Sequence, residues 1–251
     1  MLGRPKLRLS PLLYIVAAVV AVGSVAFAAC CPLFATDAAC RYAPMAEAFA
    51  AGNWAEAFHP RFGVGMPTVA GLVRLLTGMD GYSSCAAVST LAWALSMLPV
   101  FWVAEKVFGE RAAWFALILY VICPQPLIWG LKGLREPFKM LGFLLMADAL
   151  FRCRVTACSE SALCRSKGYA SAVEASLALL LLFTFKCDAL AIGGVLAVVY
   201  AVMDRFGRNT CIVAAAGILS LQPMCALVHL WTGYWLPAPQ YVRLLRMMCG
   251  G

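Results

Sequence analysis

The sequence predicts an all-α, polytopic membrane protein with about seven transmembrane helices. Of the 251 residues, 63% are hydrophobic and 13% are charged, whereas soluble domains are close to half apolar and a quarter charged. Apolar runs of about 18 or more residues, the length needed to cross a bilayer, recur along the chain. The strand-like alternation of a transmembrane barrel is absent. We therefore expect residues 1–251 to form a single transmembrane domain.

The first apolar run, Pro11 to Phe34, follows three basic residues, Arg4, Lys6 and Arg8. It resembles a signal peptide as well, because Ala26-Phe27-Ala28 is similar to a cleavage site. Its length and the apolar runs that follow favour an uncleaved first span. The basic residues ahead of it place the N-terminus in the cytoplasm.

Residues 35–83 are then expected to form the first outer loop, with amphipathic helices at the membrane surface. Pro44 suits the first turn of a short helix that ends before Gly52. A second, half-hydrophobic helix is expected from Pro67 to Leu76, ending at Gly78. Short amphipathic helices of this kind lie along the bilayer surface.

Six further spans follow this loop. They are expected at Ser84–Ala104, Ala112–Trp129, Pro137–Phe151, Ala172–Phe185, Ala189–Met203 and Cys211–Trp231. Alternation across the membrane makes residues 152–171 a cytoplasmic loop. The fourth to sixth spans are short, so they either form a tight hairpin around Lys186-Cys187-Asp188 or extend beyond these limits. Several outer loops carry cations that the positive-inside rule disfavours, which indicates a bound anion or a span count that is off by one.

The charge pattern argues against a nucleic-acid partner, and the cysteine spacing argues against a metal site. The net charge is +8, and the charged residues lie between the apolar runs, where they contact lipid headgroups of the membrane. A basic stripe interleaved with aromatic residues is absent, so nucleic acid is not an expected partner. Six of the twelve cysteines lie inside the expected spans as small packing residues. Cys153, Cys158 and Cys164 share one loop, but their spacing does not predict a metal site.

Asp37 is the first candidate for chemistry, because it follows the first span closely and a carboxylate beside hydrocarbon is costly unless paired or hydrated. It could serve as a general base or as a cation partner at the membrane surface. Equally, it could cap a helix or pair with Arg41. The residue pattern leaves these alternatives open.

Arg135-Glu136-Pro137 opens the expected fourth span on the outer side. Glu136 and Pro137 suit an ordinary helix start. Arg135 and Lys139 do not, because cations oppose the dipole at a helix N-terminus. A phosphate bound by the free N–H groups and both cations would account for them.

Lys186 and Asp188 interrupt an apolar run, either as a salt bridge at a turn or as the lining of a polar cavity. The histidines, His59 and His229, lack the neighbouring ligands that a metal site needs. Phosphate-binding glycine loops, serine nucleophile elbows and metalloprotease motifs are absent from the sequence.

The order of these features resembles the GT-C superfamily of membrane glycosyltransferases, in particular the branch of the protein mannosyltransferases and the lipid A aminoarabinose transferase. The likeness covers about residues 10–235. The matching positions are Asp37, Arg41-Tyr42, Met45-Ala46, Gly52-Asn53-Trp54, Pro124-Gln125-Pro126 and Gly133-Leu134-Arg135-Glu136.

The resemblance implies transfer of a sugar from a polyprenyl-phosphate donor to a lipid or glycan acceptor on the outer face of the inner (cytoplasmic) membrane. Asp37 would be the catalytic base, and Arg135, Lys139 and Lys186 would bind the donor phosphate. The other site residues it implies are Arg41, Tyr42, His59, Arg61, Glu136 and Asp188.

Two departures from the family pattern leave alternatives. Ala38 stands where relatives carry a second acidic residue, so a divalent cation cofactor has little support. The chain ends soon after the seventh span, so it would correspond to the shared seven-span module. The alternatives are a non-catalytic membrane subunit that binds a lipid carrier, and a transporter of small molecules or lipids.

Overall fold

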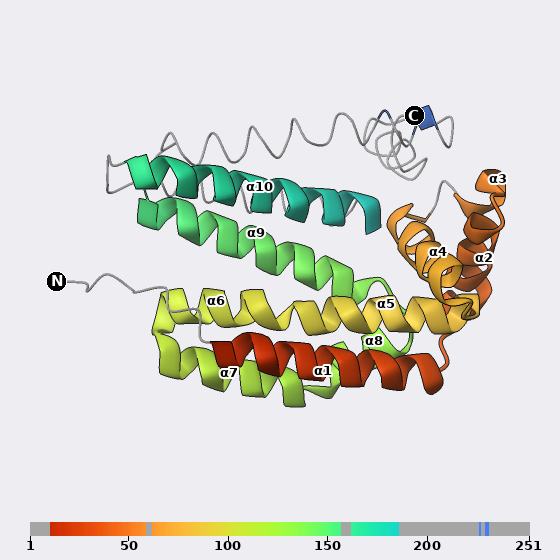
Figure 1. The fold of residues 1–251 in the computed structure, drawn as a ribbon, viewed down its shortest axis with the longest axis horizontal. Coiled ribbons are helices and arrows are strands. Elements are labelled where there is room, and N and C mark those ends of the chain that lie inside the picture. Colours follow the sequence, from red (N-terminus) through yellow and green to blue (C-terminus); the bar gives the residue numbers. More distant parts are fainter. Residues whose placement is uncertain (1–10, 59–61, 157–161, 186–225, 227–228, 231–251) are drawn as a thin grey trace, which may run out of the picture.

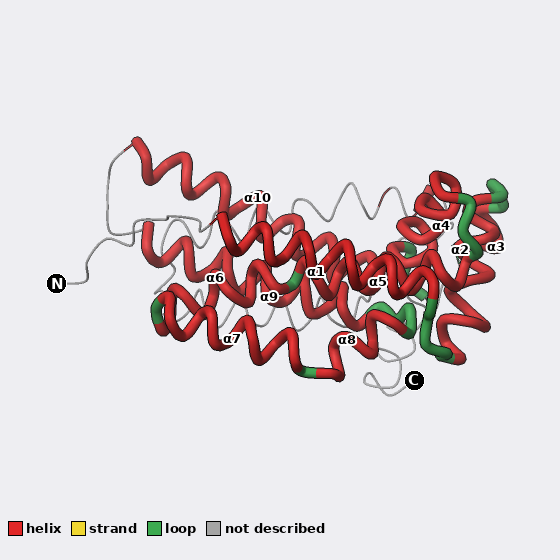
Figure 2. The backbone as a smooth tube through the Cα atoms, turned by 60° about the horizontal axis from the view of Figure 1, so that its bottom comes forward, coloured by secondary structure: helices red, strands yellow, loops and turns green. Residues whose placement is uncertain are grey.

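The computed structural model describes residues 11–58, 62–156 and 162–185, together with 226, 229 and 230. Within these residues the regular elements are helices and no strand is present (Figures 1 and 2). The predicted all-α class is therefore confirmed for the described part of the chain. Spans predicted at Ala189–Met203 and Cys211–Trp231 lie outside the described residues, apart from a few positions near residue 229.

Long helices run side by side along the longest axis, and shorter ones gather at one end (Figure 1). In chain order the helices are α1 (Pro11–Cys30), the π-helix η1 (Ala38–Tyr42), α2 (Ala43–Ala50), α3 (Trp54–Ala57), α4 (Gly65–Thr77), α5 (Gly81–Leu95), α6 (Met97–Phe108), α7 (Glu110–Ile122), α8 (Pro124–Leu131), α9 (Glu136–Thr156) and α10 (Ala162–Phe185). We call the end that bears α2, α3 and α4 the loop end. The opposite end, where α6 turns into α7, is the Gly109 end.

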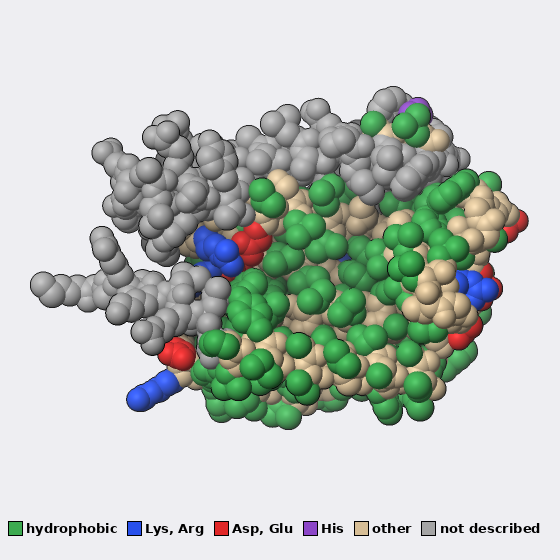
Figure 3. Space-filling view, in the orientation of Figure 1, with side chains coloured by type: hydrophobic (Ala, Val, Ile, Leu, Met, Phe, Trp, Pro, Cys, Tyr) green, Lys and Arg blue, Asp and Glu red, His purple; other side chains and the backbone are tan. Residues whose placement is uncertain are grey.

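Two helical stretches of the described residues are long and apolar enough to cross a membrane: α1, and the nearly continuous Gly81–Phe108 formed by α5 and α6. A third is possible if α7 and α8, which are bent by 50°, count as one span. On the face shown in Figure 3, charged side chains gather at the two ends, and the surface between them is mostly hydrophobic. This distribution fits a bundle whose middle lies in hydrocarbon.

The span predicted at Ala112–Trp129 is not one straight helix. Cys123 has extended backbone angles, φ −67° and ψ 113°, between α7 and α8. The next residue is Pro124, which disfavours helical geometry in the residue before it and has no N–H to donate. The chain therefore bends at Cys123 and restarts as α8.

Helices occupy most of residues 152–171, the predicted cytoplasmic loop, whose side of the membrane stays a prediction. α9 continues to Thr156 and α10 begins at Ala162, so both helices are longer than the expected spans Pro137–Phe151 and Ala172–Phe185. Hydropathy located only the apolar part of each helix. A helix can continue into polar sequence, because its backbone hydrogen bonds do not depend on apolar side chains.

The short helices of the first loop were predicted correctly. α2 carries Pro44 in its first turn, and α4 ends at Gly78, whose φ of +74° is the left-handed geometry that favours glycine at a helix end. α1 ends at Cys30 instead of Phe34, just before Pro32. The predicted boundaries thus hold at Pro44 and Gly78, whereas the effect of Pro32 on the end of α1 was missed.

α5 is the central helix and is buried along most of its length. Small side chains let its neighbours approach closely: a Cβ on Gly130 of α8 would lie 3.0 Å from the Thr90 Cα. The large side chain of Trp93 is also buried: it is 1% exposed and packs in a cluster that includes Leu13 of α1 and Met97 of α6. α5 therefore connects the first helix, the α8 turn and α9.

A buried group of charged side chains joins α6, α9 and α10 toward the Gly109 end. Asp148 is fully buried and forms ion pairs with Lys106 and, at 2.6 Å, with the Arg152 Nε. The same Arg152 Nε lies 3.6 Å from Glu174 Oε2, and its guanidinium lies over the Trp102 ring at 5.3 Å. We call Lys106, Asp148, Arg152 and Glu174 the Asp148 network.

Asp80 caps the N-terminus of α5, and its Oδ1 accepts hydrogen bonds from the backbone N–H groups of Tyr82 (2.9 Å) and Ser83 (3.0 Å). Burial alone would raise the pKa of Asp80, but these hydrogen bonds outweigh it and hold the pKa below its ordinary value. The cap therefore stabilises the fold above the ordinary aspartate pKa of about 4, and this contribution is lost as pH falls through the lower folded-state pKa.

An Asp80→Asn variant should keep a capping oxygen but lose this pH dependence. We expect its thermal unfolding midpoint to fall less than that of the wild type between pH 6 and pH 3, because the amide does not take up a proton. Glu56→Gln, at an exposed position in α3, is the matched control and should follow the wild type. Equal acid sensitivity in wild type and Asp80→Asn would contradict the assignment.

Candidate functional site

The segment that carries Asp37 begins as a helix at Ala35 and widens into the π-helix η1. The Ala35 carbonyl accepts a hydrogen bond from the Ala39 N–H at 2.9 Å, and η1 then runs through Ala38–Tyr42. Single turns of π-helix occur often at functional sites. Asp37 makes no side-chain capping bond, so it is not the helix cap that was one of its two ordinary interpretations.

Asp37 instead pairs with Arg41, the other ordinary interpretation. Asp37 Oδ1 lies 2.8 Å from Arg41 Nη1, and the two side chains are 54% and 51% exposed. Ion pairs this exposed contribute about 0.2–1 kcal/mol. Asp37 can therefore exchange Arg41 for another partner at little cost.

Tyr42, at the end of η1, brings the predicted site residues together. Its ring is buried and packs in the same cluster as Phe138 of α9. The Arg135 guanidinium lies over the Tyr42 ring at 5.9 Å, the Arg41 guanidinium lies over the Phe62 ring at 5.1 Å, and the two rings meet edge to face at 6.2 Å. Two arginines thus flank one aromatic pair at the loop end.

The start of α9 supplies the rest of the charge. Glu136 opens α9, and its Oε1 accepts a hydrogen bond from Lys139 Nζ at 2.9 Å. Arg135, half-buried, has no carboxylate within ion-pair distance among the described residues. We call Asp37, Arg41, Tyr42, Arg135, Glu136 and Lys139 the Tyr42 site. It contains three cations and two carboxylates, so it carries a net charge of +1 and leaves Arg135 available to an anion.

Tyr42 itself is neutral at physiological pH. Burial raises the pKa of its hydroxyl to about 12; Arg135 opposes the increase, and the carboxylates of Glu136 and Asp37 add to it. The phenol is therefore a hydrogen-bond donor in the site and not a base. Asp37 is the more suitable group to accept a proton there.

Four predicted site residues lie outside the described residues: His59, Arg61, Lys186 and Asp188. Their assignments remain predictions. In the described part of the chain, no group of three or more His, Cys, Asp or Glu side chains is arranged to hold a metal ion. Ala38, where a second acid was expected from the family pattern, is 0% exposed and packs in the core.

Sequence reasoning missed three features. Phe62 joins the Tyr42 site through its ring, and Tyr82 contacts the chain just before Asp37; nothing in the sequence indicated either contact. The Asp148 network did have a signal, since Asp148 and Glu174 are acidic residues within or beside apolar runs, where an ionisable group needs a partner.

Comparisons of the chain with protein-family models, curated proteins and solved structures gave no match. The interpretation of the site therefore rests on its own geometry and on the motifs quoted above.

Proposed function

We propose that this protein is an integral membrane glycosyltransferase that moves a sugar from a polyprenyl-phosphate donor to an acceptor hydroxyl. The observation that carries the proposal is that the Arg135 guanidinium lies over the Tyr42 ring at 5.9 Å, at the end of the π-helix η1 that Asp37 immediately precedes. A candidate base and a candidate phosphate ligand, 98 positions apart in the sequence, are thereby combined in one site.

In the proposed reaction, Asp37 accepts the proton of the acceptor hydroxyl as its oxygen attacks the anomeric carbon of the donor sugar. A new glycosidic C–O bond forms, and the bond from that carbon to the phosphate oxygen breaks. Polyprenyl phosphate leaves with the electron pair. Arg135, with Lys139 one turn along α9, stabilises the negative charge that develops on the phosphate.

The hydrocarbon tail of the donor would lie against the apolar helices. α1 and α7 present apolar side chains outward, including Val22 (72% exposed) and Ile122 (66%). The proposed location is the inner (cytoplasmic) membrane with the N-terminus in the cytoplasm, which places the loop end and its site on the outer, periplasmic or extracellular face.

A second candidate is a non-catalytic subunit that binds the lipid carrier without turnover. The buried position of Ala38 favours it, because that site cannot present the second carboxylate of the family pattern to a substrate. The Asp37–Arg41 ion pair also favours a non-catalytic subunit, because Arg41 occupies the carboxylate of the candidate base. One experiment separates the two candidates.

The protein in lipid nanodiscs is titrated with polyprenyl phosphate to measure affinity. Release of polyprenyl phosphate is then followed with a panel of polyprenyl-phosphate-linked hexoses and pentoses, each supplied with lipid and glycan acceptors that carry a free hydroxyl. For Asp37→Asn we expect release to fall about 10²–10⁴-fold, the usual contribution of a general base, with donor affinity unchanged. For Arg135→Gln we expect affinity to fall roughly 10-fold or more, because a charge-assisted hydrogen bond is lost.

Glu56→Gln and Arg111→Gln are the matched controls, because each removes an exposed charge of the same sign outside the Tyr42 site; both should match the wild type. Full release by Asp37→Asn would show that the catalytic assignment is wrong. Tight binding without release by the wild type would favour the non-catalytic subunit. Absence of binding would reject both candidates.

A further inference from the structure

The hydroxyl of Tyr82 holds the chain two residues before Asp37. It accepts a hydrogen bond from the Ala35 N–H at 2.7 Å and donates one to the Leu33 carbonyl. Ala35 is also the residue whose carbonyl begins the helical turn that carries Asp37. One phenol therefore holds the backbone on both sides of Phe34, immediately before that helix starts.

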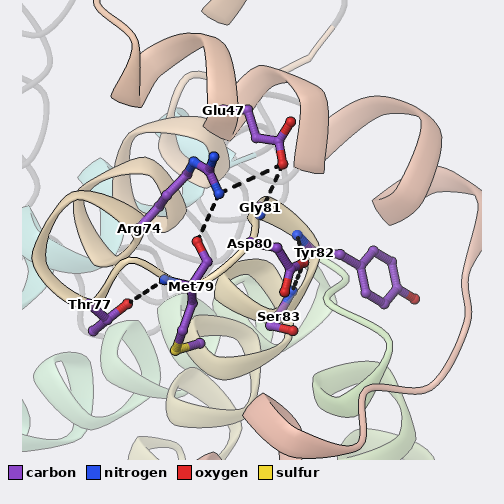
Figure 4. A network of polar contacts seen from close by, with 8 residues as sticks. All are labelled: Glu47, Arg74, Thr77, Met79, Asp80, Gly81, Tyr82 and Ser83. Carbon is purple, nitrogen blue, oxygen red and sulfur yellow. Dashed lines mark hydrogen bonds and ion pairs between the residues drawn. The ribbon is translucent and has the colours of Figure 1, made fainter.

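Tyr82 is itself held at the first turn of α5 by a network of polar contacts (Figure 4). Asp80 Oδ1 accepts a hydrogen bond from the Tyr82 N–H, and Glu47 Oε1 accepts one from the Gly81 N–H at 3.2 Å. Arg74 donates to the Met79 carbonyl at 2.8 Å and lies 3.8 Å from Glu47 Oε1. The backbone just before Tyr82 is thus tied to α2 and α4.

The start of α5 also packs directly on the start of α2. A Cβ on Gly81 would lie 2.6 Å from the carbonyl oxygen of Ala43, the residue that follows η1. In Figure 4 the Tyr82 ring projects away from Glu47 and Arg74, so its hydroxyl faces outward from this network. The two ends of the Asp37 segment, Ala35 and Ala43, therefore both rest on the first turn of α5.

We propose that Tyr82 is a positioning residue for Asp37: its hydroxyl sets where the Asp37 carboxylate stands relative to Arg135. The inference rests on the proposed function. A small displacement of a catalytic group lowers the rate of the chemical step, because productive geometry must be held closely. The Tyr82 hydroxyl bonds to Leu33 and Ala35 and not to Arg135, so we expect donor binding not to depend on it.

The test uses Tyr82→Phe, which keeps the ring and removes the two hydrogen bonds. We expect faster amide hydrogen exchange at Ala35 and about a 10-fold lower maximal rate of polyprenyl phosphate release, equivalent to about 1.4 kcal/mol, with KM and donor affinity unchanged. Tyr14→Phe, the same change on the 40%-exposed Tyr14 of α1, should match the wild type in every measurement.

A double-mutant cycle shows whether Tyr82 acts through Asp37. In the Asp37→Asn background, Tyr82→Phe should produce no further loss, because coupled residues are not additive. An equal loss in both backgrounds, or full release by Tyr82→Phe despite faster Ala35 exchange, would overturn the positioning role while leaving the proposed function standing. A wild type that releases no polyprenyl phosphate would overturn both.

Discussion

Replacement of Asp148 by alanine is expected to lower the free energy of unfolding by about 3–5 kcal/mol. Asp148 is fully buried, and it neutralises Lys106 on α6 and Arg152 one turn along α9. Without it, Lys106, whose side chain is only 20% exposed, has no carboxylate within ion-pair distance among the described residues. The cost comes from leaving that cation buried without a partner, and it exceeds the net stabilisation that the intact pair provides.

Reversible unfolding in mixed detergent micelles measures this change. Glu110→Ala, at an exposed position near the same end of the bundle, is the matched control and should change stability by less than about 0.5 kcal/mol. A loss for Asp148→Ala no larger than that of the control would mean that water or lipid headgroups reach the Asp148 network and compensate its charges.

Replacement of Gly133 by alanine is expected to destabilise the fold by about 2–5 kcal/mol, the sum of a backbone cost and a packing cost. Its φ of +65° is left-handed, which costs a residue with a Cβ about 1–2 kcal/mol. A Cβ would also lie 3.1 Å from the Ala86 nitrogen and 3.1 Å from the Cys85 Cβ. Both atoms belong to the buried part of α5 and cannot shift unless that helix moves, so an overpacking cost of about 1–3 kcal/mol is added.

Gly78→Ala separates these two causes. Gly78 has a φ of +74°, and a Cβ added there would have no atom within 4 Å, so its substitution should cost only the conformational part. Gly133 also lies two residues before Arg135, so Gly133→Ala should weaken polyprenyl phosphate binding, whereas Gly78→Ala should leave it unchanged. Equal destabilisation by the two variants would contradict the close packing of the Gly133 turn on α5.

The bundle shows which kinds of boundary a sequence can locate. Pro44 and Gly78 marked the limits of α2 and α4, because their effects on the backbone are local. Pro124 was visible too, but the apolar residues on both sides of it suggested one span. Whether a proline bends a helix or ends it depends on the partners available to the freed backbone groups, and these partners come from the tertiary structure.

The candidate site likewise has residues that the sequence could predict and contacts that it could not. The sequence identified Asp37, Arg41, Arg135, Glu136 and Lys139 as residues of interest from their chemistry and their position beside apolar runs, and Tyr42 from the family resemblance. The contacts of Phe62 and Tyr82 with this segment depend on how α5 and the first loop pack, and no local pattern encodes that packing.

By itself, the sequence determined the helical class, the apolar stretches suited to a membrane and the residue types that could bind phosphate or accept a proton. These properties follow from composition and from short-range periodicity, which act within a few residues. Only the tertiary structure decided that Arg135 lies over the Tyr42 ring, that Ala38 packs in the core and that Asp148 joins three helices. Such contacts between distant segments are selected by the packing of whole helices, because each helix can bury its small residues against several partners and only one arrangement fills the space and pairs the buried charges.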